Sequence, residues 1–397
     1  MKDSILVFGV GDLQKSIIER CKLKNLFVVG IDPQAEATCR ELVDAFEVVG
    51  GQDFEKTIEV AEHYQVKGII TAATDKPLVM MARVAEKLQL PFFSVETAEW
   101  STDKLLMKQK FQEAGIPCAR GFLLNSVDEL ATLKVDYPVI VKPRDNSGSR
   151  GVIYCANLDD AESAVSEALN YTRKGNVLVE EFVEGKEYSI ESLHNADETH
   201  VIQYTEKITT PRPYNVELGH IQPADLTINQ KGEINSIISG IAVCMGFTNC
   251  ASHTELKINS SGIYVIETSP RLGGDFITSH LVPLSTGVNM EEQLINISLG
   301  DTVDFKSVNQ ASLITYFNFP IGQKIINTIS ADEIGRRFPC VVDYKFNLKI
   351  GDEISLITNS LNRYGYFVIA GSNKQILLKQ QEEINMFLEN YMVDNLN

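Results

Sequence analysis

The sequence predicts an α/β protein with additional α+β elements, divided among two or three domains. A chain of 397 residues is too long for one ordinary hydrophobic core. Its first 95 or so residues alternate apolar, β-branched runs with segments of helical spacing, which is the pattern of a parallel sheet. Paired strand patterns fill the middle of the chain, and an amphipathic helix is expected near its end.

The N-terminal region shows this alternation most clearly. Strands are expected at 4–10, 26–32, 66–74 and 90–95, and helices at 37–46 and 77–90. Gly9 and Gly11, followed by Asp32, resemble a dinucleotide-binding turn, but Gln14 stands where the third glycine belongs. We therefore expect a doubly wound domain that keeps the turn and binds no dinucleotide. A dinucleotide oxidoreductase is the alternative that the missing glycine disfavours.

A helix is expected from Ser101 or Thr102, as its N-cap, to Gly115, which suits the end of a helix. Within it, Lys104 and Lys108 are four residues apart and share one helical face. This pair is either a solvated basic face or a source of charge near a phosphate.

The segment 137–151 has the form of a phosphate-binding element. Val139–Val141 forms a buried strand that delivers Lys142, and Pro143 stops further pairing. The small residues that follow leave backbone N–H groups free for a phosphate. The segment is not a Walker A loop, which ends in Gly-Lys-Ser/Thr. The alternative is an ordinary surface turn.

Two acidic patterns follow this loop. The strands at 176–194 carry Glu180 and Glu187 among apolar residues, which favours a polar cleft over an exposed edge strand. A β-hairpin over 252–268 places Glu255 and Glu267 on one face, where two carboxylates can hold a hard divalent cation. The alternative is a pair of solvent-facing glutamates. The polar, proline-containing segment 201–224 is a candidate binding loop, and no chemistry is expected beyond about residue 300.

Composition narrows the partners and the location. The net charge of −17 argues against binding to nucleic acid or to an anionic membrane, and makes magnesium plausible beside an anionic nucleotide. The seven cysteines show no C-x-x-C pair, which is typical of reduced thiols. The N-terminus lacks a targeting pattern and no apolar run is long enough to span a membrane, so a cytoplasmic protein is expected.

Taken together, these motifs resemble the ATP-grasp family of ATP-dependent carboxylate–amine ligases. Within the family, VELGHIQPA and ETSPRLGGD are most similar to the L-amino-acid ligases that form dipeptides. The resemblance implies an ATP-grasp fold with an N-terminal Rossmann-like domain and a C-terminal flanking α+β domain. The implied divisions are a Rossmann-like domain (1–100), a small lid subdomain with its linker helix (101–183), a large subdomain (184–300) and the flanking domain (301–397).

The resemblance also implies roles for single residues at the nucleotide. Lys104 and Lys142 match the two lysines that hold ATP phosphates. In the following motif, Glu180 matches the adenine-side acid, Val183 the backbone contact to adenine, and Glu187 the ribose-binding acid. The flexible loop over the β- and γ-phosphates corresponds to Ser147, Gly148, Ser149 and Gly151.

Further roles concern the metal and the substrates. Glu255 and Glu267 match the carboxylates that hold Mg²⁺ or Mn²⁺, with two ions expected. Ser269 replaces the family's metal-ligating asparagine, and its hydroxyl is expected to bind metal or water with altered geometry. Arg271 matches the arginine that steadies an acyl phosphate. The residues that resemble the lining of the amino-acid pocket are Glu217, His220, Arg271, Gly273 and Gly274.

The implied reaction joins a small-molecule carboxylate to an amine through an acyl phosphate, with release of ADP and phosphate. His220 would orient the second substrate or accept its proton. No nucleic acid or membrane takes part, and a homodimer is left open. The alternatives are another ATP-grasp reaction, of the carbamoyl-phosphate-synthase or purine-pathway kind, and a non-catalytic ATP-binding protein.

Overall fold

The computed structural model describes residues 2–146, 148, 150–196 and 198–394. The N-terminal region forms a parallel sheet, as predicted, with strand order β3-β2-β1-β4. Its strands are β1 (Ser4–Phe8), β2 (Phe27–Asp32), β3 (Ala45–Val48) and β4 (Val66–Ile70). Three helices accompany them, namely α1 (Lys15–Leu23), α2 (Phe54–His63) and α3 (Leu78–Leu88).

Two elements predicted in this region are wrong. The segment 37–46 is not a helix, because its backbone bonds to the sheet: Cys39 N–H donates to Val10 O and Asp44 N–H to Val28 O. Only a short 3-10 turn, Arg40–Leu42, precedes β3. The segment 90–95 is not a strand. Pro91 lacks an N–H to donate, and the Ser94 hydroxyl caps the next helix by accepting from Thr97 N–H.

The helix predicted between Ser101 or Thr102 and Gly115 is confirmed as α5 (Lys104–Glu113), and a separate helix, α4 (Val95–Ser101), precedes it. The N-cap of α5 is Asp103, not Ser101 or Thr102, and its carboxylate accepts from the Leu105 and Leu106 N–H groups. A carboxylate caps better than the predicted hydroxyls here because it also neutralises two cations, Arg144 and Lys174. Gly115 has a φ of +69°, the left-handed conformation expected after a helix.

A small antiparallel sheet, called the lid sheet, follows with the order β5-β8-β6-β7. Its strands are β5 (Gly121–Leu124), β6 (Val139–Pro143), β7 (Ile153–Cys155) and β8 (Val177–Glu181). Helix α6 (Leu158–Leu169) packs on it, and a 3-10 helix, Val127–Thr132, lies between β5 and β6. The segment predicted to bind phosphate joins β6 to β7.

The rest of the chain builds one antiparallel sheet of eight strands, called the large sheet, with the order β13-β12-β9-β10-β11-β14-β16-β15. Its first five strands in chain order are β9 (Lys186–Asn195), β10 (Glu198–Thr209), β11 (Glu217–Gln222), β12 (Cys250–Asn259) and β13 (Gly262–Ser269). The remaining strands are β14 (Ala311–Tyr316), β15 (Val341–Phe346) and β16 (Gly365–Gly371). The predicted β12–β13 hairpin is therefore confirmed.

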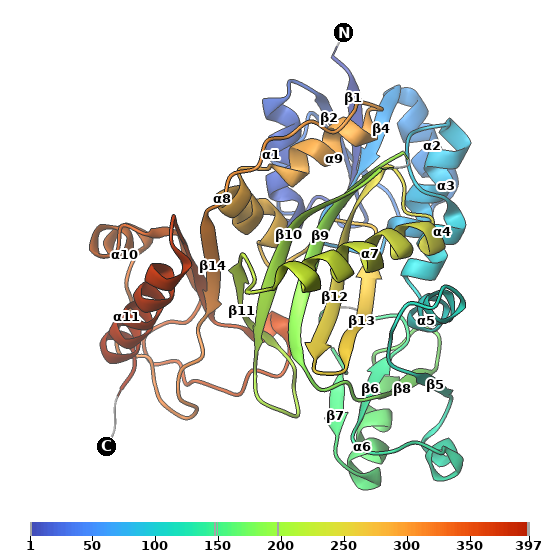
Figure 1. The fold of residues 1–397 in the computed structure, drawn as a ribbon. Coiled ribbons are helices and arrows are strands. Elements are labelled where there is room, and N and C mark those ends of the chain that lie inside the picture. The colour runs from blue at the N-terminus through green and yellow to red at the C-terminus, as the bar shows by residue number, and fades with distance from the viewer. Residues whose placement is uncertain (1, 147, 149, 197, 395–397) are drawn as a thin grey trace.

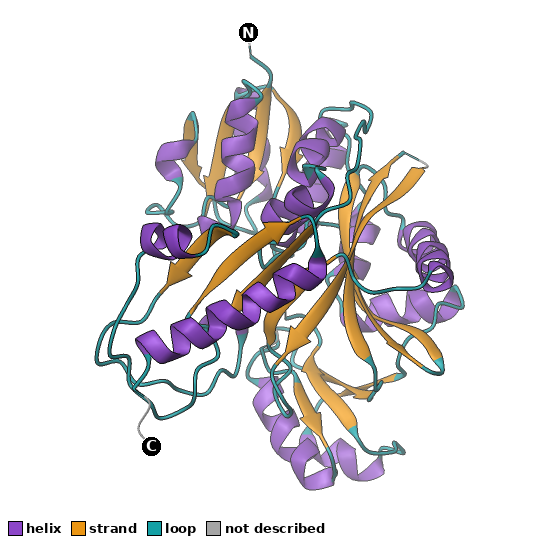
Figure 2. Ribbon diagram, turned by 60° about the vertical axis from the view of Figure 1, so that its left-hand side comes forward, coloured by secondary structure: helices purple, strands orange, loops and turns teal. Residues whose placement is uncertain are grey.

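Helices cover the large sheet and tie it to its neighbours (Figure 1). They are α7 (Ile228–Met245), α8 (Val282–Thr286), α9 (Met290–Ser298), α10 (Ala331–Arg337) and α11 (Lys374–Met392), the last being the predicted amphipathic helix. Figure 2 shows helices against both the large sheet and the lid sheet. Among the described residues, no helix is long and apolar enough to cross a membrane.

Hydrophobic packing divides the molecule into a frame and a separate lid. One core joins the N-terminal sheet to the large sheet, since it contains Ile5 and Val28 together with Ala251, Leu272 and Val368. The lid sheet and α6 have a core of their own. Within the large sheet, β11 pairs with β14 in an unbroken register, and this pairing joins the C-terminal strands β14, β15 and β16 to the rest of the sheet. The proposed domain limits stay predictions.

Candidate nucleotide and substrate cleft

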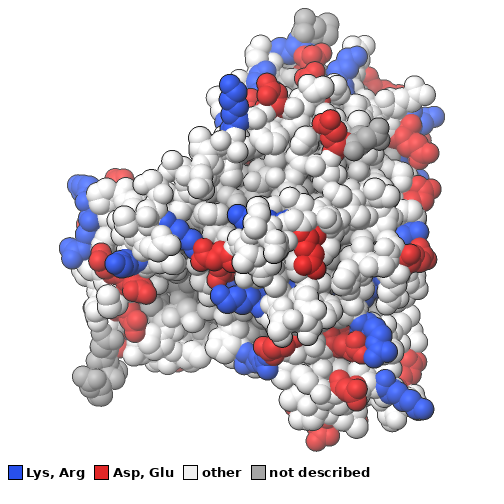
Figure 3. Space-filling model, in the orientation of Figure 1, with Lys and Arg blue, Asp and Glu red and all other residues white. Residues whose placement is uncertain are grey.

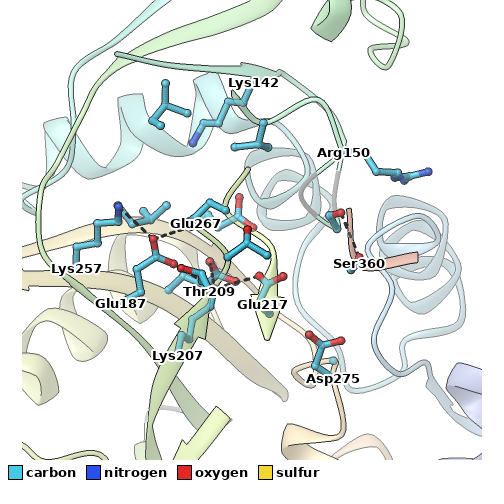
Figure 4. Close-up of a pocket in the computed structure, with 18 of the residues that line it drawn as sticks. Lys142, Arg150, Glu187, Lys207, Thr209, Glu217, Lys257, Glu267, Asp275 and Ser360 are labelled. Carbon is cyan, nitrogen blue, oxygen red and sulfur yellow. Dashed lines mark hydrogen bonds and ion pairs between the residues drawn. The ribbon is translucent and has the colours of Figure 1, made fainter. Parts of the chain in front are cut away.

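A cleft of about 920 Å³ lies between the lid sheet and the large sheet. Its lining comes from every region of the chain, from the N-terminal domain to the loop before β16. Figure 4 shows Lys142 on one side of this space, with Glu187, Lys207, Glu217 and Glu267 gathered opposite it. The face seen in Figure 3 carries interspersed acidic and basic side chains, without a continuous basic patch.

Most predicted site residues meet in this cleft. They are Lys104, Lys142, Gly148, Glu180, Val183, Glu187, Glu217, His220, Glu255, Glu267, Arg271 and Gly274. Ser269, Gly273 and Gly151 are not among its lining residues. Gly151, with a φ of +72°, serves the turn into β7. Ser147 and Ser149 lie outside the described residues. The roles assigned to all of these residues stay predictions.

At the lid, a buried carboxylate lies between two lysines. Glu180, on β8, is 3% exposed, and its Oε1 is 2.7 Å from Lys142 Nζ while its Oε2 is 3.2 Å from Lys108 Nζ. Burial alone would raise the pKa of Glu180, but the two lysines lower it below its usual range. Burial lowers the pKa of Lys142. Lys108 thus joins α5 to the lid sheet, and the interpretation of Lys104 and Lys108 as a solvated face is wrong.

The predicted metal-binding hairpin has the expected register. Glu255 and Glu267 are direct partners on β12 and β13. Each meets a lysine: Glu255 Oε2 lies 2.9 Å from Lys207 Nζ, and Glu267 Oε2 lies 2.9 Å from Lys104 Nζ. Burial alone would lower the pKa of Lys207, but Glu255 and its acidic neighbours raise it well above its usual range. Two opposed carboxylates are suitable ligands for a divalent metal if the lysines turn to another anion.

The donor set fits a metal that arrives with a nucleotide. Among the residues that the structure describes, no three His, Cys, Asp or Glu side chains are arranged to hold a metal ion by themselves. Mg²⁺ is usually bound through one or two carboxylates together with substrate phosphates and water. Glu255 and Glu267 have the two carboxylates that such a site needs, and their role as metal ligands stays a prediction.

At the C-terminal end of β13, Asp75 forms hydrogen bonds with Ser269 and Arg271. The Arg271 Nε donates to Asp75 Oδ1 at 2.8 Å, and Nη2 donates to Oδ2 at 3.3 Å. The Ser269 hydroxyl also donates to Asp75 Oδ1, at 2.6 Å. Burial would raise the pKa of Asp75, but Arg271 and Ser269 lower it to about 2. Ser269 is therefore occupied by Asp75, and its role as a metal ligand stays a prediction.

Two side chains, Glu191 and His253, approach the backbone at Gly273 so closely that a larger residue would not fit. A Cβ at this position would lie 2.7 Å from Glu191 Oε2 and 2.8 Å from His253 Nδ1. These two side chains form a chain that continues to the hairpin: His253 Nδ1 is 2.6 Å from Glu191 Oε1, and Nε2 is 3.4 Å from Glu255 Oε1. A Cβ at Gly274 would meet only Ala73 Cβ, at 3.9 Å.

Several lining residues were missed by sequence reasoning. Asp75, Lys207 and Lys257 carried no motif, although Lys207 lies in the predicted binding loop 201–224. Asp275 ends the motif ETSPRLGGD, but no role was assigned to it. The expectation of no chemistry beyond residue 300 is wrong, since Ser360, Leu361 and Arg363 line the cleft. Arg363 lies in the region where no chemistry was expected, and its ion pair with Asp275 spans 88 residues. A lone arginine with a distant partner leaves no local pattern.

The glycine turn at the N-terminus is braced by its own side chains. Asp32 Oδ2 accepts from Val10 N–H at 2.9 Å, and Oδ1 accepts from Gln34 N–H at 2.9 Å. The Gln14 side chain fills the turn, with Oε1 3.1 Å from where a Cβ on Gly9 would lie. Asp32 thus has a structural function, and the expectation that no dinucleotide binds here stays a prediction.

The comparisons with known proteins agree with this geometry. Residues 135–279 match the ATP-grasp domain family. The alanine–anticapsin ligase of Bacillus amyloliquefaciens is 25% identical over 268 residues, covering 61% of this chain and 56% of the ligase. This chain thus spans little more than half the length of that relative.

Two solved structures show the fold. The L-amino acid ligase from Bacillus licheniformis has a TM-score of 0.81 at 19% identity, with 100% of this chain and 99% of that chain covered. The biotin carboxylase domain of the Hydrogenobacter thermophilus 2-oxoglutarate carboxylase, a dimer solved with MgADP and bicarbonate, has a TM-score of 0.73 at 20% identity, covering 96% and 89% of the two chains. The chain therefore contains an ATP-grasp domain and has, as predicted, the ATP-grasp fold along its whole length.

Proposed function

We propose that this protein is an ATP-dependent ligase that joins an amino-acid carboxylate to an amine through an acyl phosphate, releasing ADP and phosphate. One observation carries the proposal. Four of the cations that line the cleft form ion pairs around its centre: Lys142 with Glu180, Lys104 with Glu267, Lys207 with Glu255, and Arg271 with Asp75. Such a row suits a polyphosphate and the carboxylate that attacks it. The likeness to L-amino acid ligases supports the choice of substrate.

The first step would be phosphoryl transfer. A carboxylate oxygen of the substrate attacks the γ-phosphorus, the bond to the β–γ bridging oxygen breaks, and ADP leaves. Lys104, Lys142 and Lys207 would hold the phosphates and neutralise charge, while Arg271 orients the attacking carboxylate. Positioning and charge stabilisation are the main contributions of a protein to such a reaction.

Divalent metal fits the same site. Glu255 and Glu267 would hold Mg²⁺ or Mn²⁺, two ions being proposed, and the bound metal would neutralise phosphate oxygens. Lys104 and Lys207, released from those carboxylates, would then be available to the nucleotide. Glu187, which accepts from Asn215 and pairs with Lys257 at 3.1 Å, would bind the ribose near Val183.

In the second step, the amine nitrogen attacks the acyl carbon and phosphate leaves as the amide forms. The amine must lose a proton on the way, and His220 would accept this proton or orient the amine. His220 is 1% exposed and lines the cleft. The acyl phosphate must be protected from water, which the lid sheet, with its separate core, would do by closing over the cleft.

Location and assembly belong to the same proposal. The proposed location is the cytoplasm, where ATP and magnesium are available. A homodimer is proposed on the example of the Hydrogenobacter domain, which was solved as a dimer.

ADP release tests the proposal directly. Wild-type protein is assayed with ATP, Mg²⁺ and all pairs of the twenty amino acids, and products are identified by mass spectrometry. Lys142→Ala and Glu267→Ala should abolish ADP formation and leave the fold intact. Lys22→Ala, which removes an exposed ion pair with Asp44 in the N-terminal domain, is the matched control and should retain full activity.

Two other outcomes separate the alternatives. ADP release that depends on bicarbonate rather than on an amino acid would favour a reaction of the carboxylase kind, in keeping with the likeness to 2-oxoglutarate carboxylase. Tight ATP binding with no carboxylate-dependent turnover would instead favour a non-catalytic ATP-binding protein. Normal turnover in Lys142→Ala or Glu267→Ala would refute the assigned roles.

A further inference from the structure

A buried ion pair stands at the substrate end of the cleft, outside the residues assigned so far. Asp275 follows Arg271, Gly273 and Gly274 on the loop after β13, and it faces Arg363 from the segment before β16. Arg363 Nη1 donates to Asp275 Oδ2 at 2.9 Å, and Nη2 donates to Oδ1 at 2.6 Å. Both residues line the cleft. Figure 4 shows Asp275 beside Glu217 and near Ser360.

Arg363 is almost fully used by the protein. Its Nε donates to Ser360 O at 3.0 Å, and Nη1 also donates to Glu217 O at 3.2 Å. One face of its guanidinium lies 3.6 Å from the centre of the Tyr316 ring. With four of its five N–H groups engaged and one face covered, Arg363 holds a position and has little capacity left for a ligand.

Asp275 has the capacity that Arg363 lacks. Its side chain is 25% exposed, against 10% for Arg363. A carboxylate has about four acceptor sites, and the arginine fork occupies one on each oxygen. His220 Nε2 lies 3.4 Å from Oδ2, a distance too long for a strong hydrogen bond. Asp275 can therefore accept further donors from the cleft.

The charges around Asp275 leave it ionised. Burial would raise the pKa of its carboxyl, but Arg363 and His220 lower it well below the usual range. The nearby Glu217 carboxylate is paired with Lys207 at 3.3 Å. Within the described part of the chain, His220 Nδ1 is buried without a hydrogen-bond partner. Asp275, which lines the cleft with spare acceptor capacity, can therefore take a donor group of a polar ligand.

The backbone here is strained. Asp275 has a φ of +51° and Phe276, next to it, a φ of +60°. Asparagine and aspartate enter this region more readily than other residues, whereas a bulky aromatic residue there is a true outlier. Phe276 is kept in place by packing on Tyr366, with ring centres 4.5 Å apart. Strain of this kind persists where the surrounding structure fixes it, commonly at functional sites.

We propose that Asp275 binds the ammonium group of the amino acid whose carboxylate is activated, and that Arg363 is the positioning residue that fixes Asp275. The charge that each amine must carry in the reaction explains why the ammonium group of the acyl donor is chosen. The amine that attacks the acyl phosphate must be uncharged, so a fixed carboxylate is suited to an amine that does not react. The α-ammonium of the acyl donor is such an amine, and it would lie beside Asp275 when its carboxylate faces Arg271, four residues earlier.

This inference rests on the proposed function, and hydroxylamine as the amine keeps its test independent of the natural second substrate. ADP release is measured for each amino acid and for its des-amino acid, such as alanine and propionate. Wild type should prefer the amino acid. Asp275→Asn should raise KM for the amino acid by about 30-fold or more, change kcat little, and leave the des-amino acid within about threefold. Arg363→Lys should shift KM in the same direction by less.

The control is Asp44→Asn, the same chemical change at a carboxylate outside the cleft, which should alter neither substrate. Equal losses on both substrates in Asp275→Asn, or an unchanged ratio, would overturn the inference. Wild-type turnover of des-amino acids without any preference for amino acids would overturn it while leaving an ATP-dependent ligase in place. Absence of ADP release with every carboxylate would overturn both proposals.

Discussion

The ion pairs of Glu180 offer the sharpest test of how the lid sheet is held. Glu180→Gln keeps the size and the backbone pairing of the residue, which lies opposite Gly121 on β5 and Ile140 on β6. It removes the charge that compensates Lys142, at 2.7 Å, and Lys108, at 3.2 Å. Two lysine side chains, 5% and 4% exposed, would then stay buried without a counter-charge.

The expected magnitude follows from that burial. Removing one partner of a buried ion pair costs about 3–5 kcal/mol, because the remaining charge stays desolvated. Here two charges lose the same partner, so the upper part of this range applies. The opening equilibrium of the lid sheet should increase by about 10³-fold or more, at 1.4 kcal/mol for each factor of ten.

Hydrogen exchange followed by mass spectrometry measures this opening on the peptides that contain β6 and β8. Glu181→Gln is the control one residue further along the strand. Glu181 pairs with Arg120, but their side chains are 34% and 72% exposed, and an exposed pair contributes at most about 1 kcal/mol. The reasoning is refuted if Glu180→Gln accelerates exchange no more than Glu181→Gln does.

Two further predictions concern the loops around the hairpin. Asp75 has a folded-state pKa of about 2, below the unfolded value of about 3.9, so its stabilisation is complete above pH 4 and is lost as the pH falls toward 2. Wild type should lose about 2.5 kcal/mol more stability than Asp75→Asn in that window, as measured by urea unfolding; parallel curves would contradict this. Gly273→Ala should abolish ADP release, because its Cβ would lie 2.7 Å from Glu191 Oε2. Gly274→Ala, with its nearest contact at 3.9 Å, should stay active, and equal effects of the two changes would count against this account of the loop.

Local patterns predicted the hairpin and its two carboxylates well. In β12 and β13 the period of two residues decides which face a side chain occupies. The direct pairing of Glu255 with Glu267 also needs a register shift between Glu255 and Leu256, which no local pattern indicates. The strand that delivers Lys142 and the last helix were predictable for the same reason, because each is defined by the periodicity of its own residues.

Long-range partners could not be predicted in this way. Asp75 meets Arg271 across 196 residues, and Arg363 meets Asp275 across 88; neither acid nor base lies in a periodic segment. The failed helix at 37–46 has a related cause. Its apolar spacing fits a helix, but the Asp44 carboxylate and N–H group both bond to the backbone of β2, at Val28. Tertiary hydrogen bonds decided its conformation.

The pairing of the proposed phosphate-binding lysines Lys104 and Lys207 with carboxylates has a consequence for binding. Lys104 is held by Glu267 and Lys207 by Glu255, each at 2.9 Å. A lysine that turns to a phosphate leaves its glutamate beside an incoming polyanion, which is unfavourable unless another cation replaces it. Nucleotide and divalent metal should therefore bind cooperatively, each improving the affinity of the other by the same factor.

Titration calorimetry with a non-hydrolysable ATP analogue measures this coupling. We expect affinity to fall by about tenfold or more when Mg²⁺ is replaced by EDTA, within the usual range of coupling free energies. Glu267→Gln frees Lys104 in advance, so this variant should bind the analogue with a much smaller dependence on Mg²⁺. Equal metal dependence in wild type and Glu267→Gln would mean that Lys104 does not exchange partners, and that the hairpin carboxylates are not the link between metal and nucleotide.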